Sequence, residues 1–168
     1  LVGVVIGVLV ATIRSSYDKT ADDLHGFGKG VLSFLNALCK IYLTVIRGTP
    51  VVVQLLIMYL IIMANVRNSL YVAIATFGIN SGAYVAEIIR AGIASIDAGQ
   101  MEAGRSLGFG YIKTMTYIII PQAFKNVLPA LLNEFIALLK ETSVAGYVGI
   151  RDLTKAGESI RGQIADAD

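Results

Sequence analysis

The sequence predicts an all-α, polytopic integral membrane protein, and two observations support this fold class. First, 55% of the 168 residues are hydrophobic and only 15% are charged, with a mean hydropathy of +0.69; soluble domains carry about 25% charged residues. Second, apolar runs close to the ~20 residues that a helix needs to cross a bilayer recur along the chain. This apolar surface exceeds what one small soluble core can bury, so the expected solvent is lipid.

Four membrane segments are expected within a single transmembrane domain that covers residues 1–168. They are a partial segment at residues 1–13 and longer ones at 41–64, 70–93 and 124–148. Because the first is too short to cross a bilayer and the chain ends in a polar stretch, we expect a fragment that lacks parts of its first and last membrane helices. In the second segment Pro50 removes a backbone hydrogen bond, which the Thr49 hydroxyl can partly replace.

The basic residues predict how these segments are oriented. They gather in or beside two polar regions, namely the loop after the first segment and the interruption at residues 96–121, called the hook below. These basic residues are Arg14, Lys19, Lys29, Lys40, Arg90, Arg105, Lys113 and Lys125. The loop between the second and third segments carries only Arg67. The positive-inside rule therefore places the first loop and the hook in the cytoplasm.

Several kinds of chemistry are excluded by composition. The net charge of +2 and the absence of a basic and aromatic stripe give no case for nucleic acid. Cys39 and His25 are each the sole residue of their type, so we expect no disulfide framework and no metal site. The glycines at 26–30 are not followed by Gly-Lys-Ser/Thr, so they do not form a phosphate-binding loop. We therefore expect no cofactor in this chain and no ATP hydrolysis by it.

The hook is the most informative stretch of the sequence. Asp97 and Gln100 have the spacing of a capping box, which predicts that a short helix starts there. Gly108 is well placed to end this helix, because glycine takes the left-handed conformation without a Cβ penalty. A second short helix is expected over residues 111–118, and Pro121 should stop or kink it.

The hook resembles the EAA loop found in the permease subunits of bacterial ABC importers. That pattern is Glu-Ala-Ala, three residues, Gly, nine residues, Ile, one residue, and Leu-Pro. The matching residues are Glu102, Ala103, Gly108, Ile118 and Pro121. Gly104 stands where the second Ala is usual, and Ile120 stands where Leu is usual.

The resemblance extends through most of residues 40–150 and is to the polar amino-acid branch of these permeases. It is carried by the stretches at residues 47–50, 80–87, 96–100, 121–123, 133–135 and 139–143. It implies a type I ABC importer permease fold in the bacterial cytoplasmic membrane. It also implies that two permease subunits, identical or not, work with ATPase subunits that hold ATP and Mg, and with an extracytoplasmic amino-acid-binding protein.

In this family the hook couples the permease to its ATPase. The residues expected to take part are Asp97, Glu102, Ala103, Gly104, Leu107, Gly108, Phe109 and Pro121. Met101, Leu107, Phe109 and Met115 can form an apolar face against the ATPase. Glu102 can pair with a basic residue of the partner, or with Arg105 on its own helix.

Polar residues within the spans are candidates for a substrate pathway, because polar groups in a membrane are costly and usually face protein or water. These candidates are Asn80, Tyr84, Glu87, Asn133 and Glu134. A carboxylate among them could pair with the ammonium of an amino acid. The same groups could instead bond across helices and hold the protein together, and the sequence leaves both readings open. Gly78 and Gly82 form a GxxxG pair in the third predicted segment, residues 70–93.

Two other classes of function remain as alternatives to an importer subunit. One is a membrane scaffold or sensor that docks a soluble partner through the hook without transporting anything. The other is a secondary transporter driven by ions, which would need no docking helix for a motor. The sequence does not specify which amino acid would be carried.

Overall fold

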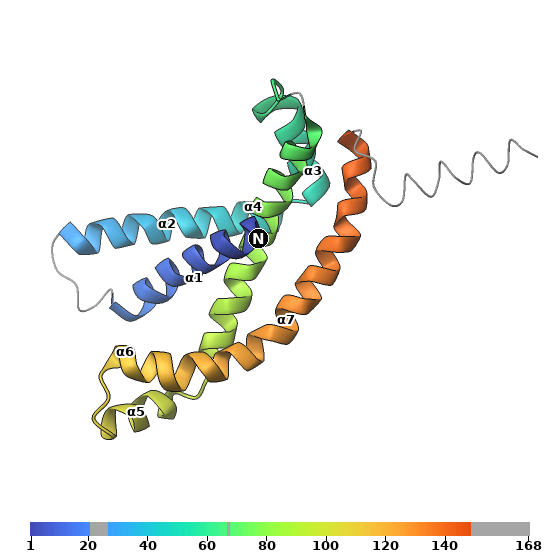
Figure 1. Ribbon diagram of the computed structural model, residues 1–168. Helices are drawn as coiled ribbons and strands as arrows, with labels where there is room; N and C mark the ends of the chain where they lie inside the picture. The colour runs from blue at the N-terminus through green and yellow to red at the C-terminus, as the bar shows by residue number, and fades with distance from the viewer. Residues whose placement is uncertain (21–26, 67, 149–168) are drawn as a thin grey trace, which may run out of the picture.

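The computed structural model describes residues 1–20, 27–66 and 68–148, and these residues form helices and their connections, with no strand. In Figure 1 the central helix α4 runs from the top of the molecule to the hook at the bottom. The α-helices are α1 (Val2–Thr20), α2 (Phe27–Gly48), α3 (Val51–Ile57), α4 (Ser69–Ala94), α5 (Ala98–Ser106), α6 (Tyr111–Thr114) and α7 (Ile120–Glu141). Met58–Ile62 and Met115–Ile119 are π-helical, and Thr142–Val148 is a 3₁₀ helix.

Helix α4 forms the core because its neighbours cover it on several sides. It packs against α1, α2, α3 and α7, and its buried residues include Val72, Ala83 and Ala86. A helix that is apolar around most of its circumference is expected at such a central position. At its start, the side chain of Asn68 accepts a hydrogen bond of 3.0 Å from the Leu70 amide, which caps the first turn.

Small residues allow α1 and α4 to lie close together. A Cβ atom added at Gly7 of α1 would fall 2.5 Å from Cγ1 of Val85, and one at Gly82 of α4 would fall 2.8 Å from Cγ2 of Ile6. Neither position has room for a larger side chain. The glycine pair expected from the sequence thus marks a helix–helix contact, as small residues often do in membrane proteins.

The second predicted segment, residues 41–64, does not form one helix. Helix α2 starts earlier, at Phe27, and ends at Gly48, and α3 begins after Pro50 in a different direction (Figure 1). The first polar loop is likewise shorter than expected, because α1 continues through Arg14 to Thr20. By length and composition, two helices of the described chain could cross a membrane, Gly28–Gly48 and Ser69–Ala94.

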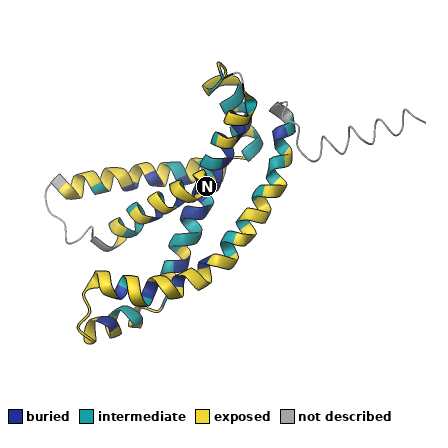
Figure 2. Ribbon diagram, in the orientation of Figure 1, coloured by how far each residue is buried: buried dark blue, intermediate teal, exposed yellow. Residues whose placement is uncertain are grey.

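The outer surfaces of α2 and α7 are strongly apolar. Figure 2 shows both helices with long exposed stretches. On α7 the exposed large apolar residues are Ile120, Phe124, Leu128, Leu132, Phe135, Ile136 and Leu139. An apolar surface of this extent is typical of a protein that contacts lipid or other subunits.

Candidate functional site

The hook begins where the sequence predicts, although the capping bond differs in detail. Asp97 is the N-cap residue of α5, and its carboxylate accepts a 2.6 Å hydrogen bond from the amide of Gly99. Gln100 does not complete a reciprocal capping box. Its side-chain oxygen instead accepts a 3.3 Å hydrogen bond from Gln122, which ties the first helix of the hook to the start of α7.

The turn of the hook is a glycine-dependent helix ending, as predicted. Gly108 has a φ of +80°, the left-handed value that glycine adopts without steric cost. Its amide donates to the carbonyl of Arg105 at 2.9 Å, and the amide of Phe109 donates to the carbonyl of Gly104 at 3.0 Å. These two bonds make a Schellman motif, which satisfies carbonyl groups that the end of α5 would otherwise leave unpaired.

The two helices of the hook touch at Gly104 and Thr114. Gly104 is buried, and Thr114 is fully buried at 0% exposure. A Cβ atom added at Gly104 would fall only 2.4 Å from Cγ2 of Thr114. Glycine at this position, where alanine is usual in the EAA pattern, therefore fits the threonine that faces it.

The second helix of the hook continues into α7 without a break. Helix α6, the π-helical segment Met115–Ile119 and α7 follow each other directly. Pro121 does not end the helix; it lies in the first turn of α7, directly after the π-helical segment. The π-helical segment just before Pro121 is a local widening that often accompanies functional sites in helices.

The hook presents an apolar surface to its surroundings. Leu107, Ile112 and Tyr117 are 73%, 77% and 72% exposed, and Phe109 is also exposed. Of the four residues predicted for this face, Leu107 and Phe109 are exposed, whereas Met101 and Met115 are half-buried. Sequence reasoning placed Ile112 and Tyr117 on the second helix but did not assign them to this face.

The charged and small residues expected in coupling are also accessible. Glu102 and Ala103 both lie exposed on α5. The ion pairs found within the described ranges do not join Glu102 to Arg105. The carboxylate of Glu102 is therefore available to a partner.

Asn80, a predicted pathway residue, forms a hydrogen bond between two helices. It is 3% exposed, and its side-chain amide donates to Oε1 of Gln54 on α3 at 3.1 Å. Gln54 in turn donates to the carbonyl oxygens of Ile46 (2.8 Å) and Thr49 (3.0 Å) and to the Thr49 hydroxyl (2.8 Å). Because Pro50 has no amide hydrogen, the Ile46 carbonyl lacks its usual helical donor, and Gln54 supplies one.

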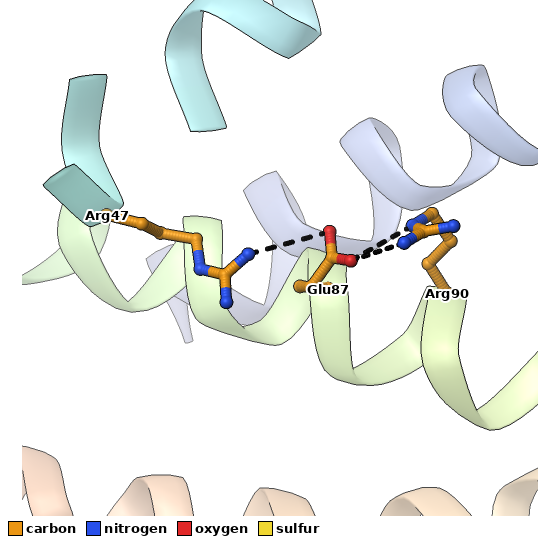
Figure 3. A network of polar contacts seen from close by, with 3 residues as sticks. All are labelled: Arg47, Glu87 and Arg90. Atoms are coloured by element: carbon orange, nitrogen blue, oxygen red, sulfur yellow. Dashed lines mark hydrogen bonds and ion pairs between the residues drawn. The ribbon is translucent and has the colours of Figure 1, made fainter. Parts of the chain in front are cut away.

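Glu87, a second predicted pathway residue, lies between two arginines (Figure 3). Its Oε1 accepts from Nε and Nη2 of Arg90 at 3.2 and 2.5 Å, and its Oε2 lies 3.9 Å from Nη1 of Arg47. Arg47 also sits over the ring of Tyr84, with 5.6 Å between the guanidinium carbon and the ring centroid. This network joins the end of α2 to the cytoplasmic half predicted for α4.

The two pathway residues predicted on α7 point in different directions. Asn133 is exposed, whereas Glu134 is half-buried. Glu134 lines a cavity of about 450 Å³ between α1, α4 and α7, together with Phe77, Ser81 and Leu138. Within this chain Tyr84 and Glu87 lie together beside Arg47, whereas Asn80, Asn133 and Glu134 lie elsewhere, so the structure does not bring all five predicted residues into one site.

The described part of the chain contains no group of three or more His, Cys, Asp or Glu residues that could hold a metal ion.

Comparison with known proteins gives concordant matches. Residues 26–162 match a family model described as a binding-protein-dependent transport system inner membrane component. The arginine transport system permease protein ArtQ of Bacillus subtilis (strain 168) is 40% identical over 140 residues, covering 74% of this chain and 64% of the relative. The glutamine transport system permease protein GlnP of Escherichia coli (strain K12) is 36% identical over 163 residues, covering 94% and 68%.

A solved structure gives a similar picture of the fold. A crystal structure of an amino acid ABC transporter with histidines superposes with a TM-score of 0.79 at 40% sequence identity. The match covers 96% of this chain and 70% of that chain. The chain therefore spans about two thirds of the length of the relatives that it matches.

Proposed function

The chain belongs to the family of binding-protein-dependent transport system inner membrane components, and on that premise we propose that it is a membrane-spanning subunit of an ATP-driven amino-acid importer. Its own task is to form part of the transport pathway and to change conformation when a motor subunit acts on it. Covalent chemistry, with ATP and Mg, belongs to that motor subunit and not to this chain.

The observation that carries this proposal is the way the hook is attached. Only residues 95–97 separate α4 from α5 at one side of the hook, and at the other side α6 leads into α7 without a break. The hook is itself closed by the Schellman turn at Gly108 and the contact of Gly104 with Thr114. A displacement of the hook is therefore transmitted to both α4 and α7, as a coupling element requires.

The proposed partners follow from the surface of the hook and from the names of the relatives. The exposed apolar residues Leu107, Phe109, Ile112 and Tyr117 suit a groove on a soluble ATPase, and the free carboxylate of Glu102 suits a basic residue beside it. A second permease subunit would cover exposed surface of α7. An extracytoplasmic binding protein would deliver the substrate to this assembly in the cytoplasmic membrane of a bacterium.

We assign the substrate class as polar amino acids. The named relatives are permeases of arginine and glutamine transport systems, and the similar structure is that of an amino acid transporter. Glu134 is the pathway candidate best placed to meet an ammonium group, because it lines a cavity and is not part of an ion pair with another described residue.

The test is uptake by the full-length protein in proteoliposomes, together with the ATPase and the binding protein that purify with it. Labelled arginine and glutamine are offered separately, with and without ATP. We expect uptake that requires both ATP and the binding protein. Uptake that follows an ion gradient without ATP would identify an ion-driven carrier, and the absence of flux with all components present would favour a scaffold.

A pair of hook variants tests the coupling surface. Leu107→Glu places a charge in the middle of the proposed apolar interface and should reduce ATPase co-purification and transport by at least tenfold. Ser106→Glu adds the same charge at the neighbouring exposed residue of the same hook, so it is the matched control. Equal retention of the ATPase by both variants would show that the hook is not the docking surface.

A further inference from the structure

A polar groove opens where α1, α2 and α4 meet, away from both the hook and the cavity beside Glu134. It has a volume of about 590 Å³. Its lining residues are Arg14, Lys40, Leu43, Thr44, Arg47, Gly48, Tyr84 and Glu87. Three of these residues are basic and one is acidic, so the groove carries a positive charge.

The acidic residue does not neutralise the groove. Glu87 already interacts with Arg47 and with Arg90, so its charge is shared between two arginines (Figure 3). Arg14 and Lys40 form no ion pair with another residue of the described ranges. The cations around the groove therefore exceed the carboxylates, and an anion placed there would meet uncompensated positive charge.

One side chain that lines the groove also carries an unsatisfied donor. Nε of Arg14 is buried and has no hydrogen-bond partner among the described residues. Leaving a buried donor without a partner is costly, and this cost would be removed if the Arg14 side chain turned its guanidinium towards an acceptor oxygen in the groove. Arg47 is meanwhile held in place by Glu87 and by the ring of Tyr84, so part of the groove is already ordered before any ligand arrives.

The position of the groove along α4 matches the level of lipid headgroups. This step rests on the proposed function, in which the hook is cytoplasmic. Helix α4 has 26 residues, which at 1.5 Å each gives about 39 Å, whereas the hydrocarbon core of a bilayer is about 30 Å thick. Glu87 lies seven residues before the end of α4, about 10 Å from the hook, and so near the cytoplasmic edge of that core.

We propose that this groove binds the phosphate headgroup of an anionic phospholipid from the cytoplasmic leaflet. Arg14, Lys40 and Arg47 would surround the phosphate oxygens, and the hydroxyl of Thr44 can donate a further hydrogen bond. The acyl chains would lie along the exposed apolar face of α2, which includes Ile41 and Val45. Basic pockets between helices at the cytoplasmic side of a membrane are known to hold anionic headgroups.

An amino-acid substrate fits the groove less well than a lipid does. An amino acid carries an ammonium as well as a carboxylate, and Glu87, which could receive the ammonium, is already bound to Arg90 and close to Arg47. A phosphodiester needs only the cations. The groove therefore favours a ligand that is purely anionic at its head and apolar at its tail.

The test is native mass spectrometry of the full-length transporter complex, purified in mild detergent and titrated with phosphatidylglycerol. Phosphatidylethanolamine, which has no net charge, is the lipid control, and inorganic phosphate is titrated separately. The variant Arg14→Gln with Lys40→Gln removes two groove charges. Lys125→Gln removes one charge from an exposed position of α7 outside the groove.

We expect the complex to retain phosphatidylglycerol in preference to phosphatidylethanolamine. The double variant should bind phosphatidylglycerol about 25-fold more weakly, since each basic residue near an anionic lipid contributes about fivefold in affinity, while Lys125→Gln should bind it as the parent does. The melting temperature of each complex is compared, so that loss of folding is not mistaken for loss of binding.

Three results would overturn the proposal. Equal weakening by the double variant and by Lys125→Gln would show general attraction to the surface and no bound lipid. Displacement of the lipid by millimolar inorganic phosphate would identify a site for free anions. Displacement by arginine or glutamine would make the groove part of the substrate pathway. None of these results depends on whether ATP drives uptake, so failure here is distinguishable from failure of the proposed function.

Discussion

At the scale of single residues, the hook depends on one close contact. Gly104 faces Thr114, and a methyl group at position 104 would overlap the threonine side chain, with 2.4 Å to its Cγ2 and 2.7 Å to its Oγ1. Buried packing of this kind holds α5 in a fixed relation to the second helix of the hook, although α5, with nine residues, is too short to be stable alone. The rigidity that a coupling element needs thus comes from a glycine and the threonine side chain that fills the space beside it.

Replacing Gly104 by Ala should therefore loosen the hook. Overpacking of this kind costs about 1–3 kcal/mol, so hydrogen exchange of the α5 amides in the assembled transporter should accelerate by about 5- to 160-fold. The variant Gly104→Ala with Thr114→Ala removes both overlapping atoms, which leaves the added Cβ 3.1 Å from the Cβ of residue 114. It should recover most of the protection, and no recovery would mean that position 104 matters for another reason.

The sequence was sufficient to locate the glycines and caps but not the partners of polar side chains. The roles of Asp97 and Gly108 follow from local backbone requirements, which a sequence pattern carries directly. The partners of Gln100 and Asn80 are Gln122 and Gln54, 22 and 26 residues away. Such contacts depend on tertiary packing, so a single sequence gives no signal for them.

At the scale of elements, the junction of α2 and α3 is held by side chains in place of backbone bonds. Pro50 removes one helical hydrogen bond, and Gln54 replaces its donor at the Ile46 carbonyl while also bonding Thr49. Asn80 then connects Gln54 to the core helix α4. The break at Pro50 is a fixed corner, because hydrogen bonds with Ile46, Thr49 and Asn80 define the position of the Gln54 side chain.

Gln54→Leu should destabilise this corner by about 1–2 kcal/mol, since the Ile46 and Thr49 carbonyl groups lose their side-chain donor in an apolar setting. Asn80→Leu removes only the link to α4 and should cost less, near the ~0.6 kcal/mol typical of hydrogen bonds within membranes. Unfolding of the full-length protein by titration with a denaturing detergent measures both. A larger loss for Asn80→Leu than for Gln54→Leu would assign the main role to Asn80.

Helix boundaries show where sequence reasoning was weakest. The apolar run at 41–64 has the length of one span, but the structure divides it at Pro50 and begins α2 at Phe27. Hydropathy measures average composition over a window, so it does not register a change of direction inside an apolar run. By contrast, α4 covers the residues of the segment predicted at 70–93, because that run contains no proline and its first turn is capped by the Asn68 side chain.

At the scale of the whole molecule, the fold implies a definite arrangement across the membrane. The hook and the short connection that precedes α4 lie at opposite ends of that helix (Figure 1). If α4 crosses the bilayer once, these two regions must face opposite compartments. The distribution of basic residues predicts that the hook is the region on the cytoplasmic side.

Cysteine labelling in intact cells checks this arrangement. Cys39 is the sole native cysteine, so Cys39→Ala gives a background for single cysteines at Asn65 and Ser106, which are both exposed. We expect a membrane-impermeant maleimide added outside to label Asn65→Cys, and to label Ser106→Cys only after the cells are opened. Labelling of both from outside, or the reverse pattern, would contradict the topology.

The π-helical segment at Met115–Ile119 sets the rotational phase between the hook and α7. A π turn accommodates one more residue than an α turn, and each residue of an α-helix advances it by about 100°. Deleting a single residue there would make the helix more regular, yet would turn Ile112 and its neighbours by about that angle around the axis of α7. The same one-residue deletion would therefore make the helix more regular and weaken binding of the hook to the ATPase.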